Sequence, residues 1–264
     1  MLALSVAWQG PDMEPADFYS GIVVDAYAKL KSSSFEAGPY IDFVRATGEP
    51  ALEIGCGDGE PMLDLCVAGL VVDGVDSSAD MVDRCRQNAA KRGISTHVYQ
   101  QRVEALNLAR RYTSIYFAGP TFNLLADDGT ATRALEAISR HLTGHGAALI
   151  PLWIPDPTPQ ADMGVSRTAA DGPGVELSYT PLSETYDKDT RTRVTTSRYQ
   201  RTTSSGTESV DREWVIHWHT PHAFVAMCQE AGLEVLALVD NETNTRASEI
   251  STEFTATVRR ASTV

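Results

Sequence analysis

The sequence predicts an α/β protein with a doubly wound, seven-stranded sheet and a late antiparallel β-insertion. Short apolar runs rich in β-branched residues alternate with helical patterns over residues 1–153 and again over 220–264. Such alternation is typical of parallel strands joined by crossover helices. Residues 154–219 change to a polar, Thr-rich pattern with a period of two. That period is typical of antiparallel strands with one covered face.

Five of the expected strands precede the insertion and two follow it. They are the runs at 51–54, 70–75, 96–99, 112–117 and 147–153, and then those at 233–240 and 253–258. We expect helices at 80–92, where Ser77 and Asp80 resemble a capping box, and around 130–142. A third helix is expected to start at Pro221, capped by Thr220, and to stop at Gly232.

The insertion begins with an irregular Pro-rich stretch at 154–164. Three strands should follow, at 175–186, 191–203 and 208–219, with turns near 187–190 and 204–207. We therefore expect residues 1–153 and 220–264 to form one domain with an N-terminal helical lid. Residues 154–219 should form a β-insertion over its binding site.

Composition and charge exclude several kinds of protein. The 264 residues are 42% hydrophobic, enough for a sizeable core, and no apolar stretch is long enough to span a bilayer. The 22 basic and 35 acidic residues give a net charge of −13, which argues against nucleic-acid and anionic-membrane partners. The four cysteines form no CxxC pair, and the N-terminus lacks a positive signal region. We therefore expect a reduced, cytoplasmic protein.

The most informative segment is a strand that runs into three glycines at alternate positions, Gly55, Gly57 and Gly59. Glycines there allow a ligand to approach the backbone closely. Glu53 precedes the turn and would repel a pyrophosphate but attract an ammonium group. The next strand ends in Asp76, which can accept hydrogen bonds from both hydroxyls of a ribose.

These residues resemble the first two motifs of class I S-adenosylmethionine-dependent methyltransferases, over Glu53 to Gly59 and over Val75 to Met81. The resemblance covers roughly residues 35–153 and the end of the chain in outline. It implies a Rossmann-like sheet and S-adenosylmethionine (SAM) as the cofactor. The late insertion and Trp153-Ile-Pro155 are similar to deoxyaminosugar N-methyltransferases and related small-molecule enzymes.

The resemblance also implies a set of cofactor-binding residues that share the carboxyl ends of the first four strands. Glu53 would reach the ammonium group, Asp76 would bind the ribose, and Arg102 stands where an acidic residue is common in the family. The implied set is Glu53, Gly55, Cys56, Gly57, Gly59, Asp76, Ser77, Met81, Gln101, Arg102, Val103 and Phe117.

Methyl transfer depends mainly on orientation and desolvation, and a general base is useful without being obligatory. The catalytic candidates are His217, Asn123 and Tyr19. Related aminosugar enzymes tend to carry a histidine near Asn123, so the identity of a base stays open. The substrate-binding candidates are Tyr27, Phe122, Trp153 and His219. For Tyr19 and Tyr27, packing of an amphipathic helix is as consistent with the pattern as a lid.

His217 and His219 are expected on one face of a strand. A metal pair is one interpretation, but the sequence indicates no third ligand, so we expect no metal. Two histidines on the polar face of the strand are the simplest interpretation, and a base at the mouth of the site is a third.

The leading hypothesis is methyl transfer to a small-molecule acceptor in biosynthetic metabolism, with nitrogen as the first choice of acceptor and oxygen as the second. One alternative is an NAD-dependent oxidoreductase, although the spacing is GxGxG and not GxGxxG. Another is a non-catalytic SAM-binding scaffold. The oligomeric state stays open, a homodimer included.

Overall fold

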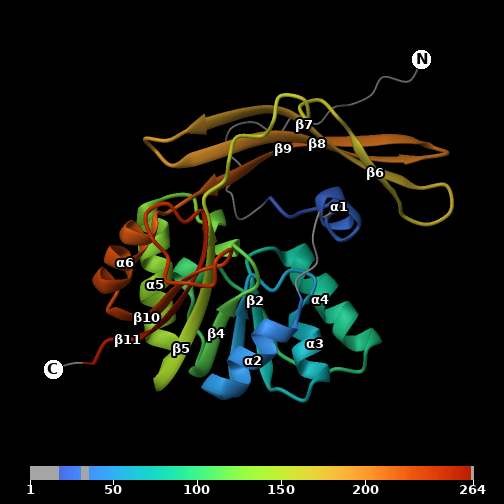
Figure 1. Ribbon diagram of the computed structural model, residues 1–264. Coiled ribbons are helices and arrows are strands. Elements are labelled where there is room, and N and C mark those ends of the chain that lie inside the picture. Colours follow the sequence, from blue (N-terminus) through green and yellow to red (C-terminus); the bar gives the residue numbers. More distant parts are fainter. Residues whose placement is uncertain (1–17, 31–35, 263–264) are drawn as a thin grey trace. The chain divides into compact units, whose positions relative to one another are not determined.

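A computed structural model describes residues 18–30 and 36–262 (Figure 1). The chain divides into two compact units. Unit 1 consists of residues 1–34 and 156–216, and unit 2 consists of 35–155 and 217–264. These boundaries lie within a few residues of the expected insertion, but the N-terminal segment groups with the insertion.

Unit 2 is built on a seven-stranded sheet with the order β10-β11-β5-β4-β1-β2-β3, which confirms the expected fold class. Strands β1 to β5 are parallel, and β10 and β11 form an antiparallel hairpin that pairs with β5 through β11. The bounds are β1 Ala51–Ile54, β2 Val72–Asp76, β3 Val98–Gln100, β4 Tyr112–Phe117, β5 Leu142–Trp153, β10 Leu233–Asp240 and β11 Glu253–Arg260.

Five α-helices and two short 3-10 helices connect these strands in the described part of unit 2. They are α2 Gly38–Thr47, α3 Met62–Val67, α4 Ala79–Lys91, η2 Val103–Ala105, η3 Thr121–Leu124, α5 Asp128–His141 and α6 Pro221–Glu230. The expected capping residue of α4 was wrong by one position. Ser78 caps the helix, because its hydroxyl accepts the backbone N–H of Met81 at 3.1 Å. Thr220 caps α6 as expected.

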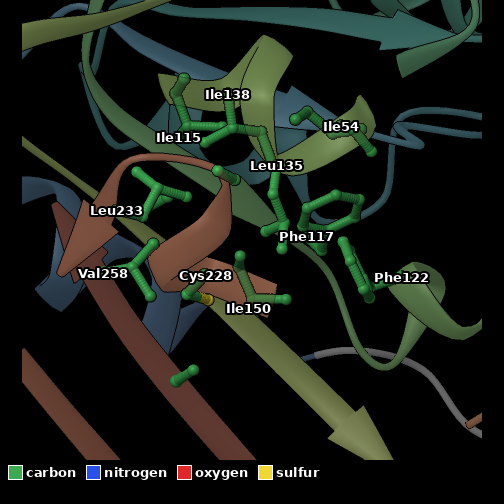
Figure 2. Packing of buried hydrophobic residues seen from close by; sticks show 14 of the residues in the cluster. Ile54, Ile115, Phe117, Phe122, Leu135, Ile138, Ile150, Cys228, Leu233 and Val258 are labelled. Carbon is green, nitrogen blue, oxygen red and sulfur yellow. The ribbon is translucent and has the colours of Figure 1, made fainter. Parts of the chain in front are cut away.

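Two hydrophobic clusters cover the two faces of this sheet. One joins the sheet to α5 and α6, and Figure 2 shows Phe117, Leu135, Ile150 and Cys228 packed together in it. The other joins the sheet to α2, α3 and α4. Because side chains alternate along a strand, Leu52 and Ile54 of β1 face the first cluster, while Ala51 and Glu53 face the second.

Unit 1 contains a four-stranded antiparallel sheet with the order β6-β7-β8-β9. Its strands are β6 Arg167–Ala170, β7 Glu176–Asp187, β8 Thr192–Thr203 and β9 Gly206–His217. The sequence did not indicate β6, whose four residues are mostly exposed. Helix α1, Ile22–Leu30, packs against β6, β7 and β8.

No helix in the described ranges, 18–30 and 36–262, is long and apolar enough to cross a membrane.

Candidate functional site

The glycine-rich turn lies between β1 and α3 and is tied to the end of β2. All three glycines have positive φ, at +70° for Gly55, +50° for Gly57 and +100° for Gly59. The backbone N–H groups of Gly55 and Cys56 both donate to the carbonyl oxygen of Val75, at 2.8 and 3.1 Å. The turn is therefore held to β2 by backbone hydrogen bonds, in a conformation that L side chains rarely adopt.

The three glycines differ in the space around their α-carbon atoms. A Cβ atom on Gly55 would meet Thr121 Cγ2 at 2.5 Å, and one on Gly59 would meet Leu63 at 2.7 Å. These two positions are filled by the protein itself. A Cβ on Gly57 would meet nothing within 4 Å. Gly57 is thus the position at which the turn presents bare backbone to open space, where a ligand can approach closely.

Glu53 lies in β1 and is 0% exposed. Among the described residues its carboxyl group has the hydroxyl of Tyr116 beside it and no basic partner. Burial raises its pKa well above the ordinary value, because the charged form loses its hydration. Buried carboxylates are normally paired. The orphaned carboxyl group is therefore suited to a positively charged group that comes from outside the chain.

Asp76 connects the end of β2 to the glycine turn. Its Oδ2 accepts the backbone N–H of Gly57 at 2.8 Å, and its Oδ1 accepts that of Ser78 at 2.9 Å. Burial raises its pKa, and hydrogen bonds from the backbones of Ser78, Gly57 and Ser77 offset part of that rise. Each carboxylate oxygen can accept a further hydrogen bond. Asp76 can therefore hold the turn and a ligand hydroxyl pair together.

Two tyrosines that the sequence reasoning missed complete this region. Tyr116 in β4 is the register partner of Glu53, and burial together with the neighbouring Glu53 carboxyl group raises the pKa of its hydroxyl well above the ordinary value. Tyr40 in α2 stacks on Tyr116, with 5.3 Å between ring centroids, and its hydroxyl accepts the N–H of Gly119 at 2.8 Å. Aligning the buried runs of β1 and β4 would have placed Tyr116 beside Glu53.

The residues expected near an adenine are spread over three kinds of environment. Met81 is buried in the first turn of α4, and Val103 packs against the core cluster of α5 and α6. Arg102 is exposed and Ser77 half-buried. The side chain of Gln101 is engaged with the backbone of Asn107, whose N–H donates to its Oε1 at 2.8 Å. The involvement of these residues with a ligand stays a prediction.

Phe117 and Phe122 lie in the hydrophobic core of unit 2. Their rings meet edge to face with 5.6 Å between centroids, and both are at most 1% exposed. Figure 2 shows both side chains pointing into the packed cluster. They shape the site from behind and offer little free surface to a ligand.

Asn123, expected as a catalytic candidate, is fully buried and engaged with the backbone of two other segments. Its Nδ2 donates to the carbonyl oxygens of Trp153 at 2.9 Å and His217 at 3.1 Å, and its Oδ1 accepts the N–H of Trp153 at 3.2 Å. Both amide hydrogens are thereby used. Asn123 therefore ties η3 to the backbone of Trp153 and His217 within unit 2, and a part in catalysis stays a prediction.

His217 and His219 meet an aspartate that the sequence reasoning did not connect with them. Nε2 of His217 lies 2.9 Å from Oδ1 of Asp128, and Nδ1 of His219 lies 3.4 Å from the same oxygen. Asp128 is 89 residues from His217, at the start of α5. The expected polar strand face was wrong: β9 ends at His217, and the two histidines are only 4% and 0% exposed.

Tyr19 and Tyr27 belong to unit 1, where they contact each other and Phe18. The ring centroids of Tyr19 and Tyr27 are 5.4 Å apart, and those of Tyr19 and Phe18 are 4.8 Å apart. Phe18 also approaches Tyr199 of β8 at 6.1 Å. The two tyrosines take part in an aromatic cluster, and their roles in catalysis and substrate binding stay predictions.

Glu53, Gly57 and Asp76 form the candidate site in unit 2. They present a carboxyl group without a basic partner, a bare stretch of backbone and a second carboxylate with spare acceptor capacity. This arrangement can hold a small molecule that carries an ammonium group and a pair of hydroxyls.

The part of unit 2 that contains the glycine-rich turn is similar to known methyltransferases. Residues 51–146 match a protein-family model described as a methyltransferase domain, which confirms the expected resemblance. A dTDP-3-amino-3,6-dideoxy-alpha-D-glucopyranose N,N-dimethyltransferase from Streptomyces fradiae is 26% identical over 164 residues. That alignment covers 59% of this chain and 61% of the relative.

Solved structures of methyltransferases share the fold over nearly the whole chain. A sugar N-methyltransferase from Streptoalloteichus has a TM-score of 0.74 at 18% identity, covering 98% of this chain and 99% of that one. A methyltransferase from Streptomyces caelestis has a TM-score of 0.73 at 20% identity, covering 94% and 99%. An amino pentose methyltransferase from Micromonospora echinaspora has a TM-score of 0.63 at 19% identity, covering 91% and 98%.

Proposed function

We propose that this protein is a class I SAM-dependent methyltransferase that transfers a methyl group to a nitrogen atom of a small-molecule acceptor. The observation that carries the proposal is the buried carboxyl group of Glu53, which has no basic partner among the described residues, together with the open backbone of Gly57. The methyltransferase-domain match over residues 51–146 supports it.

The residues of the candidate site fit SAM chemically. Glu53 would accept the ammonium group of the methionine part, which supplies the positive charge that this carboxyl group lacks within the chain. Asp76 would accept the two ribose hydroxyls while it keeps its bonds to Gly57 and Ser78. Gly57 would allow the ligand to lie directly on the backbone.

SAM supplies an activated methyl group, which an acceptor displaces in line. The chain contributes binding and orientation, because two reactants that are held in the right geometry lose less entropy on the way to the transition state of methyl transfer. Phe117 and Phe122, both buried in the core, make the interior at the carboxyl end of β4 apolar. None of these contributions needs a general base, and we assign none.

The choice of an amine acceptor is supported by the relatives. The Streptomyces fradiae relative and the Streptoalloteichus and Micromonospora structures are described as methyltransferases of amino or N-methylated sugars. We propose a small-molecule acceptor of related chemistry, in cytoplasmic biosynthetic metabolism. Oxygen methylation of a small molecule is the alternative, since the described site residues bind the donor and do not select the acceptor atom.

Calorimetric titration with S-adenosylhomocysteine tests the donor site, with NADH as the control ligand. We expect binding of S-adenosylhomocysteine and no signal from NADH. Asp76→Ala should weaken the binding at least about tenfold, or about 1.4 kcal/mol, because the ribose hydroxyls lose their acceptors. Binding of NADH alone would refute the proposal, and unchanged affinity in a folded Asp76→Ala protein would refute the ribose assignment.

Methyl transfer itself is tested with SAM labelled in the methyl group and matched amino and hydroxyl sugars. We expect label in the amino compounds. Label in the hydroxyl partners alone would move the assignment to oxygen. Binding of the donor with no transfer to either class would favour a non-catalytic scaffold.

A further inference from the structure

Three potential metal ligands from distant parts of the sequence gather where α5 and α6 begin. Asp128 is the first residue of α5, His217 is the last residue of β9, and His219 directly precedes Thr220, the N-cap of α6. Each offers one donor atom, and the three donor atoms all lie within 4.8 Å of one another.

The distances are close to those of a metal centre. A tetrahedral cation with bonds of about 2.1 Å separates its donor atoms by about 3.4 Å. Oδ1 of Asp128 lies 2.9 Å from Nε2 of His217 and 3.4 Å from Nδ1 of His219. The third separation, between the donor atoms of His217 and His219, is at most 4.8 Å. These two atoms would therefore need to come at most about 1.4 Å closer to reach the tetrahedral separation.

The surroundings suit neutral imidazole ligands. The two histidines are 4% and 0% exposed, and Phe122 lies against His219 with 5.7 Å between ring centroids. The side chain of Asp128 is 51% exposed. The two nitrogen donors are therefore held in an apolar wall, while the carboxylate is open to solvent and leaves a path for an ion.

The local charge favours a cation, although the site lies at the N-terminus of α5. The N-terminus of a helix carries a partial positive charge of about half an elementary unit. Asp127, the N-cap of α5, and Asp128 place two carboxyl groups there. Two carboxylates exceed the helix charge, so the site attracts a divalent ion.

We propose that Asp128, His217 and His219 form a binding site for a divalent transition-metal cation, with Zn²⁺ as the best match. Two imidazoles and a carboxylate are a ligand set that suits this class of ion. Three protein donors leave a fourth position open to water or to a small ligand. The sequence pair His217 and His219 lacked a third ligand, and the fold supplies Asp128.

The site is one short turn away from the glycine-rich loop. Thr121 of η3 lies against Gly55, and the next residue, Phe122, packs on His219. Asn123 then donates to the carbonyl oxygen of His217. The site therefore lies beside the candidate donor site, although its ligands and the inference do not depend on methyl transfer.

Cobalt titration of the full, tag-free, EDTA-treated chain tests the site, with visible absorption as the readout. Co²⁺ replaces Zn²⁺ and has characteristic absorption in a four-coordinate site. We expect one Co²⁺ per chain, displaced by Zn²⁺. His219→Ala should weaken binding roughly a hundredfold and Asp128→Asn at least about tenfold. The double variant His145→Ala/His222→Ala, which removes two exposed histidines, is the matched control and should bind as wild type.

Circular dichroism checks that each variant is folded. If His219→Ala unfolds, Asp128→Asn decides, because this half-exposed side chain keeps its shape when it loses its charge. Absence of a cobalt site in the wild-type chain would overturn the proposal and leave an Asp–His ion pair. Equal affinity in wild type and Asp128→Asn, or absorption typical of cobalt–thiolate bonds, would overturn it as well. No outcome requires enzymatic activity, so the proposed function and this site fail separately.

Discussion

Replacing Glu53 by glutamine should have opposite effects on the stability of the free protein and on the binding of its ligand. Glu53 is fully buried without a basic partner among the described residues. Burial raises its pKa, and the hydroxyl of Tyr116 offsets part of that rise. Glutamine has nearly the same shape and carries no charge. The substitution therefore removes a buried charge from the free protein and an attractive charge from the complex.

The magnitudes follow from the two environments. A buried polar group without a partner costs on the order of 1–3 kcal/mol, more when charged. Relief of the charge should therefore raise the melting temperature of the free protein by several degrees, at about 2–4 °C per kcal/mol. In the complex, a charge-assisted hydrogen bond becomes a neutral one, which loses about 1–1.5 kcal/mol. S-adenosylhomocysteine should then bind about tenfold more weakly.

The difference in stability between Glu53→Gln and wild type should increase with pH. In the unfolded chain a glutamate titrates near about 4.3, and in the folded protein the pKa of Glu53 is higher. Below about pH 4.3 both states hold the proton, so Glu53→Gln and wild type should be equally stable. As the pH rises through the folded pKa, wild type loses stability and the variant does not.

Thermal denaturation between pH 4 and 8, with and without S-adenosylhomocysteine, measures both effects. Glu136→Gln is the matched control, since it removes the same charge from an exposed position on α5. A Glu53→Gln protein that is less stable than wild type at pH 8 would show that the carboxylate has a partner in the free protein. Unchanged ligand affinity would refute the ammonium assignment.

Three further substitutions separate binding from folding. Gly57→Ala should keep the fold, at a cost of about 1–2 kcal/mol for its positive φ, and should lose S-adenosylhomocysteine binding. Gly55→Ala should lower the stability further, because its Cβ would also meet Cγ2 of Thr121 at 2.5 Å. Calorimetry and circular dichroism of both variants measure this, and equal stability would refute the distinction. Asn123→Ala should lower stability by about 3 kcal/mol, since three backbone hydrogen bonds are lost. Denaturant titration measures it against exposed Asn107→Ala, and a stable Asn123→Ala protein with reduced turnover would restore the catalytic role.

The sequence predicted β1 and β4 to the residue because each is a buried apolar run with clear ends. It missed β6, which is short and exposed, so that neither its composition nor its period differs from a loop. It also began β5 five residues late. The chain passes from the end of α5 at His141 directly into the strand at Leu142, without turn residues to mark the boundary.

The residues of the two sites also differ in how far the sequence could predict them. Glu53, Gly57 and Asp76 belong to local motifs. In the fold, Asp76 accepts the backbone N–H of Gly57 and lies close enough to Glu53 to influence its charge. Asp128 contacts His217, which lies 89 residues later in the sequence, so no local sequence pattern could predict that contact. Asn123 looked free for catalysis because hydrogen bonds to distant backbone groups leave no trace in composition.

The position of β11 has a consequence for the order in which the protein can be made. This strand is the last of the sheet in the chain, yet it lies between β5 and β10 and pairs with both. On the ribosome, β5 must wait with one open edge until residues 253–260 emerge, and open edges attract other strands. Unit 2 therefore completes its sheet late in synthesis, and a nascent chain stopped before Glu253 should depend on a chaperone to stay soluble.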